Sequence, residues 1–233
     1  MSQDMVDEGD LSLILHSLPQ SEELYSSSFT SSRSRLLTVL SPGREQMPDS
    51  FREKLLDLER SYDAVLLEPC PAGKKVSGEL ALKRCRASSN AIVSYPSVLL
   101  GSKFCLLVPG VRYGTPDFTD AMMTGCIPVV IDDDHVLPFS EVLDWTRASI
   151  RVWQGLWEEG MSRLRDLPDK KVFEMREQVL YLYRRYFFSM ATIVNTVLDI
   201  VNERVFPSAV HGYEHWNNPP YNPTLTDRMQ YDL

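Results

Sequence analysis

The chain has 233 residues, of which 43% are apolar and 24% charged, enough for one sizeable hydrophobic core. Its formal net charge of −8 argues against a general affinity for nucleic acid or for anionic membrane surfaces. There is no run of about 18 apolar residues, and the first residues are acidic rather than basic. We therefore expect neither a membrane-spanning helix nor a secretory signal peptide.

The first half of the chain predicts a variable segment followed by alternating strands and helices. Residues 1–34 are expected to be disordered or variable, because their Ser/Thr-rich stretch buries too little apolar surface to fold alone. A domain is expected over residues 35–206. Its first elements are a strand at Leu36–Leu40, a helix at Phe51–Leu58, a strand at Ala64–Leu67 and a helical turn at Tyr95–Leu100 that leads into a strand at Phe104–Val108.

The second half predicts the rest of an α/β fold with a mostly parallel sheet. We expect a short helix, a strand at Ile127–Ile131, a short helix at Phe139–Trp145 and a strand at Ser149–Val152. From Asp169 to Phe206 the apolar residues recur at helical spacing, which predicts one long helix. Its aromatic block, Tyr181 to Phe188, is interpreted as packing. Residues 207–233, rich in Pro, Asn and Tyr, predict an extended tail or linker.

The stretch from Phe104 to Ile131 reads as a βαβ unit. Its first strand ends at Pro109-Gly110, and a polar loop with a second glycine, Gly114, precedes the short helix. In open parallel sheets ligands bind beyond the carboxyl ends of the strands, and the N-terminus of a helix favours anions such as phosphate. The loop carries no complete phosphate-binding fingerprint, so an ordinary crossover whose glycines only make turns remains an alternative.

The cysteines and acidic residues allow several interpretations. Cys105 and Cys126 lie in or beside apolar strands and are expected to be buried free thiols. Cys70 and Cys85 flank a polar segment and are candidates for a disulfide that closes a loop of about 15 residues. There is no CxxC or HExxH pattern, and no metal site is expected.

Two acidic groups are candidates for a metal site or for acid–base chemistry. Asp132 to Asp134 follow a strand and could hold Mg²⁺ or Mn²⁺, but a solvated turn explains them better. Glu141 and Asp144 would share one face of the short helix predicted there. Helix capping and surface pairing explain this second pair more simply than acid–base chemistry.

Several motifs together resemble the exostosin family of glycosyltransferases. They are Ser102-Lys103-Phe104-Cys105, the glycine loop, Gly125 to Ile131, and above all LPFSEVLDW at Leu137–Trp145 followed by Arg147-Ala148-Ser149. A further match near the end is Tyr213-Glu214-x-Trp216-Asn217-x-Pro219-Pro220. The likeness runs from about Arg35 to Pro220, and the nine-residue motif is too specific to arise from composition.

The resemblance implies a Rossmann-like parallel sheet, the C-terminal, nucleotide-binding half of a GT-B glycosyltransferase. It implies transfer of glucuronic acid from UDP-glucuronate during heparan sulfate synthesis, with a glycosaminoglycan acceptor chain and no cofactor besides the UDP-sugar donor. Full-length members are expected to be anchored in the ER and Golgi lumen, where a Cys70–Cys85 disulfide is reasonable. By the same resemblance, we expect this sequence to lack the acceptor half, the anchor and a second transferase domain.

The resemblance assigns the donor site to the glycine loop and the helix after it. Gly110, Arg112, Gly114 and Thr115 would bind the diphosphate, and Asp120 would hold the uridine ribose. The catalytic residues stay unassigned. The resemblance further leads us to expect an arginine where this chain has Asp117, whose carboxylate would repel a diphosphate.

Three interpretations follow from that departure. The first is a polymerase subunit with a decayed inverting site that supports an exostosin-1-like catalytic partner. The second is an active UDP-sugar-dependent, glucuronosyl-type transferase in which Arg112 replaces the missing arginine. The third is a nonfunctional truncated fragment.

Overall fold

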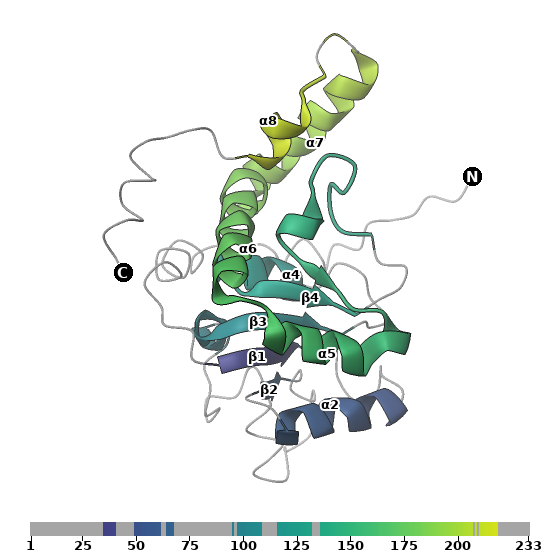
Figure 1. Ribbon diagram of the computed structural model, residues 1–233. Helices are drawn as coiled ribbons and strands as arrows, with labels where there is room; N and C mark the ends of the chain where they lie inside the picture. Colours follow the sequence, from purple (N-terminus) through teal and green to yellow (C-terminus); the bar gives the residue numbers. More distant parts are fainter. Residues whose placement is uncertain are drawn as a thin grey trace, which may run out of the picture.

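The computed structural model confirms an α/β fold built on one parallel sheet (Figure 1). It describes residues 35–40, 49–61, 64–67, 95, 97–108, 116–131, 136–206, 208 and 210–218. The five strands are β1 (Arg35–Leu40), β2 (Ala64–Leu67), β3 (Ser102–Leu107), β4 (Ile127–Val130) and β5 (Ile150–Arg151). They lie in the order β2-β1-β3-β4-β5, and every neighbouring pair is parallel. Each predicted strand is therefore present, with β5 shorter than expected.

The direction in which the chain winds reverses between β1 and β3. From β1 the chain passes to β2 at one edge, whereas from β3 it passes to β4 and β5 on the other side. Leu37 on β1 lies level with Phe104 on β3, and Phe104 with Ile127 on β4. All three central strands are apolar because helices cover both faces of the sheet. The reversal makes the carboxyl ends of β1 and β3 the crevice in which ligands bind in this class of fold.

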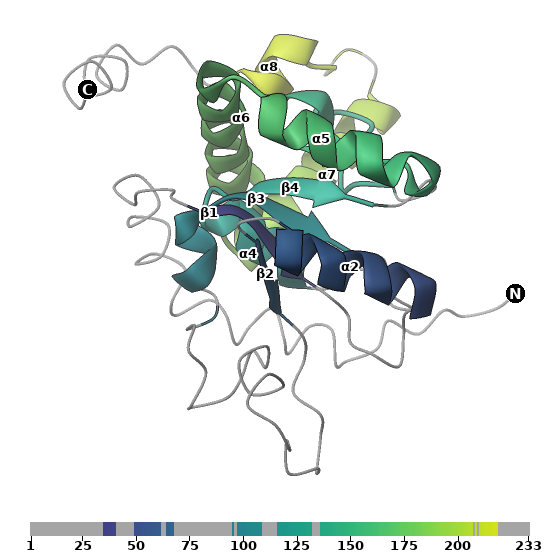
Figure 2. The same cartoon turned by 60° about the horizontal axis from the view of Figure 1, so that its bottom comes forward.

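Helices pack on both faces of the sheet (Figure 2). On one face lie α2 (Asp49–Ser61) and α5 (Trp157–Asp166), which meet where Phe51 packs edge-to-face on Trp157 with ring centroids 5.3 Å apart. The other face carries α4 (Pro116–Met123) and the 3₁₀ helix η2 (Ser97–Gly101), which share a small apolar cluster. The sequence analysis predicted α2, α4 and η2 but not α5.

The prediction of one continuous helix from Asp169 onward is wrong. The structure has α6 (Asp169–Leu182), a π-helical turn η5 (Tyr183–Phe187) and α7 (Met190–Val205). Ser189 causes the break, because its backbone is extended and its side chain accepts a hydrogen bond from the Thr192 amide, while Thr192 bonds back to the Ser189 amide. This reciprocal capping box starts a new helix. The prediction that the aromatic block is core holds for Tyr183, Tyr186 and Phe187, which are buried.

Two further expectations need correction. Residues 139–142 form turns rather than the start of the predicted helix, because Phe139 has φ of 54°, outside the helical region, and the 3₁₀ helix η3 (Trp145–Arg147) follows two residues later. The tail is not wholly extended, because Tyr213–Asn217 forms the short helix α8. A further 3₁₀ helix, η4 (Gln154–Leu156), precedes α5. No helix among the described residues is long and apolar enough to cross a bilayer.

The prediction of free thiols at Cys105 and Cys126 is wrong, because the two form a disulfide with Cα atoms 5.7 Å apart. The sheet register explains the pairing. Cys105 on β3 lies level with Pro128 on β4, and Cys126 comes two residues earlier. Both cysteines are fully buried. The candidate pair Cys70 and Cys85 lies outside the described residues, as do residues 1–34.

Candidate functional site

The predicted donor loop leaves the sheet at the reversal point. Residues 109–115 follow the carboxyl end of β3, one of the two strands that flank the reversal. Four of the predicted donor residues, Gly110, Arg112, Gly114 and Thr115, lie in this loop and outside the described residues. The fifth, Asp120, is on α4 and is described.

Helix α4 is short and is fixed at both ends. Pro116 is its first residue, where a missing amide proton costs nothing, and Asp117 places an acid in the first turn. At the far end Gly125 has φ of 64°, which side chains rarely tolerate, and its amide bonds to the Met122 carbonyl. This turn delivers the chain directly into Cys126 and β4. The disulfide thus closes a loop that contains both the predicted donor segment and α4.

The two carboxylates of α4 are buried beside Tyr95. Asp117 is 7% exposed and Asp120 is 6% exposed. The Tyr95 hydroxyl donates to Asp120 Oδ2 at 2.5 Å and lies 3.4 Å from Asp117 Oδ1. The sequence interpretation had Asp117 facing a bound diphosphate, whereas its side chain lies in this buried cluster. Tyr95 was not predicted as a site residue, because neither its place at the start of a helical turn nor its place in the family likeness shows that its hydroxyl reaches α4.

The LPFSEVLDW segment forms a compact turn above the sheet that is anchored by Trp145. The Trp145 indole donates to the Pro138 carbonyl at 2.8 Å. Its ring packs against Phe118 of α4 and Phe187 of η5, with centroids 5.2 and 6.0 Å away. Trp145 therefore joins the motif to the helix that carries Asp117 and Asp120.

A C-terminal segment, Tyr213–Asn218, packs back onto this motif, and we call it the clasp. Its centre is Asn217, which is fully buried. The Asn217 side chain accepts from the Asp144 amide at 2.6 Å and donates to the Val142 carbonyl at 2.9 Å. Its backbone carbonyl accepts from Arg147 at 3.0 Å and from Gln178 of α6 at 2.8 Å. The clasp thereby ties the motif to the long helical segment.

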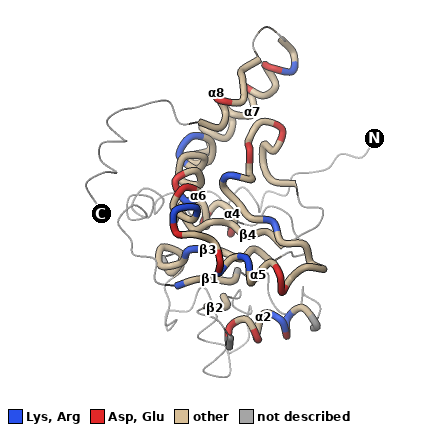
Figure 3. The backbone as a smooth tube through the Cα atoms, in the orientation of Figure 1, with Lys and Arg blue, Asp and Glu red and all other residues tan. Residues whose placement is uncertain are grey.

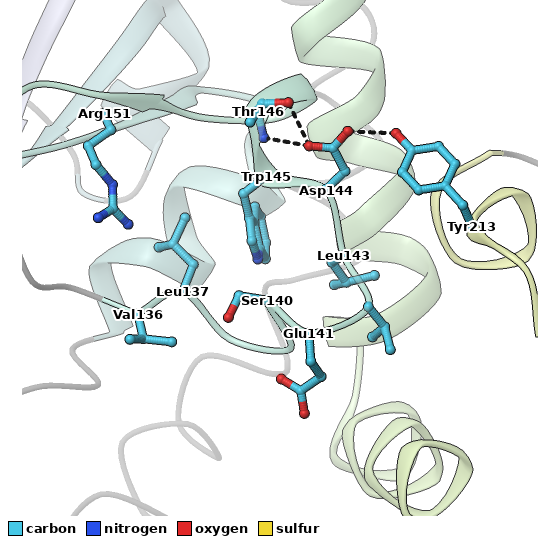
Figure 4. A pocket seen from close by; sticks show the side chains of 11 residues that line it. Val136, Leu137, Ser140, Glu141, Leu143, Asp144, Trp145, Thr146, Arg151 and Tyr213 are labelled. Atoms are coloured by element: carbon cyan, nitrogen blue, oxygen red, sulfur yellow. Dashed lines mark hydrogen bonds between the residues drawn. The ribbon is translucent and has the colours of Figure 1, made fainter. Parts of the chain in front are cut away.

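Between the motif and the clasp lies an open cavity of about 700 Å³ (Figure 4). Its polar lining includes Ser140, Glu141, Asp144, Arg151 and Tyr213. A second cavity of about 480 Å³ adjoins it and shares Arg151. Both fall within the size range of small-ligand sites.

The carboxylates of this cavity are already engaged. Asp144 accepts from the Thr146 hydroxyl and from Tyr213, each at 2.6 Å, and the hydrogen bonds from Thr146 and Tyr213 lower its pKa. Glu141 pairs with Arg204 of α7 at 2.8 Å. The two carboxylates thus have separate partners, as expected for surface pairing, although the shared helical face predicted for them is absent.

No metal site is evident in the described part of the chain, where no three His, Cys, Asp or Glu side chains come together. The candidate metal ligands Asp132 to Asp134 lie outside the described residues.

Comparison with known proteins gives consistent matches. The Exostosin GT47 domain family model matches residues 13–167. The chain is 36% identical over 172 residues to Exostosin-2 of Homo sapiens, covering 73% of this chain and 24% of that protein. It is 38% identical over 172 residues to Exostosin-2 of Bos taurus, with the same coverage of both chains. It is 33% identical over 186 residues to Exostosin-1 of Drosophila melanogaster, covering 77% of this chain and 24% of that protein. The match spans about a quarter of the length of these relatives.

Proposed function

Because the chain belongs to the exostosin GT47 family, we propose that it is a glycosyltransferase module of heparan sulfate synthesis. In this proposal it is a polymerase subunit whose own donor site has decayed and which supports an exostosin-1-like catalytic partner acting on a glycosaminoglycan chain. Its buried disulfide supports synthesis in an oxidising compartment such as the ER and Golgi lumen, because such bonds rarely persist in the cytosol.

The observation that carries the decayed-site proposal is the state of Asp120. A residue that holds a ribose must present its carboxylate to the sugar hydroxyls. Here the carboxylate is 6% exposed and accepts a hydrogen bond from Tyr95. Ribose binding would have to displace that hydroxyl and open the cluster, which opposes nucleotide binding.

The topology favours the second interpretation, an active UDP-sugar transferase of the glucuronosyl type. The glycine loop leaves β3 at the reversal point, where nucleotides bind in doubly wound sheets. In that case Gly110, Arg112, Gly114 and Thr115 bind the diphosphate, and Tyr95 gives way to the ribose when the donor enters. The two interpretations differ in whether UDP binds the unmodified chain.

Calorimetric titration of UDP into the full chain separates them, with Tyr95→Phe and Asp120→Ala measured in parallel. The decayed-site proposal expects no heat of binding from the unmodified chain. Gain of binding in Tyr95→Phe would identify the Tyr95–Asp120 bond as the block, and Asp120→Ala is the control that should not bind. Binding by the unmodified chain that is lost in Asp120→Ala would overturn the decayed-site proposal and would favour the active interpretation.

The same samples test the third interpretation, a nonfunctional fragment. A single cooperative thermal transition followed by circular dichroism would show that the chain folds as a unit. A gradual loss of signal without a transition would support the fragment interpretation and would make the absence of UDP binding uninformative about Asp120.

A further inference from the structure

Two histidines beside the end of α7 stack face to face. His211 lies in the segment that connects α7 to α8, and His215 lies on α8. Their ring centroids are 3.9 Å apart, and the ring planes are inclined by only 15°. Figure 1 shows α8 beside α7, and Figure 3 shows most of α7 without charge, with acidic and basic residues gathered near its far end. We call the two histidines, together with Glu203 of α7, the latch.

Glu203 holds the first of these histidines. Its Oε1 atom accepts from the His211 backbone amide at 3.2 Å and from the ring atom Nδ1 at 2.6 Å. Because a carboxylate only accepts, Nδ1 carries a proton, and Nε2 decides whether the ring is charged. Burial raises the pKa of Glu203, but the hydrogen bonds and the charge of His211 outweigh burial and lower it overall. Protonation of His211 is therefore compatible with a closed latch, because it turns this contact into an ion pair.

A second proton, on His215, meets a different environment. Burial lowers the pKa of His215, and the charges of His211 and of Arg185 on η5 lower it further. Glu203 and Asp199 on α7 act in the opposite direction but do not offset these effects. The groups that act on His215 thus come from the connecting segment, from η5 and from α7. When both rings are protonated, two imidazolium charges face each other at the stacking distance, which favours separation of the rings.

We propose that the latch is pH-sensitive: it holds the connecting segment and the first turn of α8 on α7 while at most one ring is charged, and it releases them when both are charged. The exposure of the side chains agrees with a local release. His211 and Tyr213 are 45% and 54% exposed, whereas Trp216 and Asn217 are buried. Release therefore concerns the outer part of the clasp, and the buried part stays in place.

Release changes the rim of the cavity between the motif and the clasp. Tyr213, the first residue of α8, lines that cavity and donates to Asp144 at 2.6 Å. Figure 4 shows its hydroxyl reaching Asp144 from the clasp side. Movement of Tyr213 away from α7 widens the cavity and removes one donor from Asp144. Acidity then controls access to the cavity, and this holds whether or not the donor site binds UDP.

Amide hydrogen exchange of the full chain, followed by NMR between about pH 7.5 and pH 5, tests the proposal, because ordinary imidazoles change charge in this range. The probes are the amides of His211 and His215, which donate to Glu203 and to the Gly212 carbonyl. We expect their protection, corrected for the effect of pH on intrinsic exchange, to fall at least about threefold as the pH drops. The protection of α6 should stay unchanged, which shows that the chain remains folded.

The variant His215→Gln, which cannot take up the second proton, should keep both amides protected at the acid end of the range. Protection that does not change with pH in the unmodified chain overturns the proposal. An equal fall of protection in His215→Gln also overturns it, because the charge on His215 is then not the cause.

Two carboxylate variants sharpen the test. Glu214→Gln is the matched control, because Glu214 lies on α8 and bonds to Asn218 rather than to the latch. Its pH dependence should equal that of the unmodified chain. Glu203→Gln removes the carboxylate that offsets the two protons, so protection should be lost at a higher pH. Loss at the same or a lower pH would overturn the part assigned to Glu203.

Discussion

Two tyrosine–aspartate hydrogen bonds lie in the two candidate site regions of this chain, and they differ in burial. Tyr95 donates to Asp120 within the buried cluster of α4, whereas Tyr213 of the clasp donates to Asp144 at the edge of an open cavity. Asp144 also accepts from Thr146, and water reaches it. The Tyr95–Asp120 bond therefore involves a carboxylate that is buried from solvent, whereas the Tyr213–Asp144 bond holds the clasp against the motif at the surface.

The two regions are also held by different means. The loop that contains α4 is closed by the disulfide between Cys105 and Cys126. The clasp is held by hydrogen bonds that converge on Asn217, which lies more than 70 residues from the motif it contacts. Substitutions in the two regions should therefore change the free energy of unfolding by different amounts, and a reductant should affect only the contribution of the disulfide.

The largest effect is expected from Asn217→Leu. Leucine keeps the volume of the side chain but leaves the Asp144 amide and the Val142 carbonyl without their partner. Two polar groups deprived of hydrogen bonds should lower the free energy of unfolding by about 4 kcal/mol. Urea denaturation measures this loss. Glu214→Gln, which alters an exposed contact of the same segment, is the control and should change stability little.

A smaller loss is expected when the disulfide is removed. In the chain-entropy model a cross-link between residues 21 positions apart contributes about 3 kcal/mol. The double variant Cys105→Ala, Cys126→Ala should lose about that amount in urea denaturation without reductant. A reductant should destabilise the unmodified chain to a similar extent and leave the double variant unaffected. Equal sensitivity of both proteins to reductant would place the contribution elsewhere.

The sequence predicted the sheet well because each strand is a local apolar run bounded by turn residues. Leu36 to Leu40 and Phe104 to Val108 need no distant information to be recognised. The cysteine pairing failed because it depends on the register between β3 and β4, which local spacing does not contain. The break before α7 failed because the helical period continues through Ser189 and hides the capping box with Thr192.

The candidate site was predicted less completely. Asp120 was placed on a helix after the donor loop, and the structure agrees, but its bond to Tyr95 joins residues 25 positions apart. The motif at Leu137–Trp145 was recognised as a signature, yet its turn conformation depends on Phe139 and on the distant clasp. Contacts across such separations are made by tertiary packing and leave no local pattern.

The two tyrosines should differ when each loses its hydroxyl. Tyr95→Phe removes the Tyr95 hydroxyl as a hydrogen-bond donor to the buried Asp120 carboxylate, and we expect a loss of about 2 kcal/mol in the free energy of unfolding. Tyr213→Phe should cost only about 0.5 kcal/mol, because Asp144 keeps Thr146 and water. Urea denaturation of both variants makes the comparison. Equal losses would mean that Asp120 is as solvated as Asp144.

The smallest effects concern pH, because the lowered pKa values of His215 in the clasp and of Asp144 in the motif act in separate pH windows. Burial, followed by the nearby His211 and Arg185, lowers the pKa of His215 below its ordinary value of 6.5. Below about pH 6.5 the unfolded chain therefore protonates His215 more readily than the folded chain does. The free energy of unfolding is therefore highest, as far as His215 is concerned, above about pH 6.5, and it falls as the pH drops below that value. The lowered pKa of Asp144 contributes stability above about pH 4, which is lost as the pH falls through the folded value.

In urea denaturation from pH 7 to pH 3, His215→Asn should flatten only the upper window. Tyr213→Phe should reduce the slope only in the lower window, because it removes one of the hydrogen bonds that lower the Asp144 pKa. If Tyr213→Phe leaves the lower window unchanged, the clasp does not set the ionisation of the motif. The hydrogen bonds from Thr146 alone would then account for it.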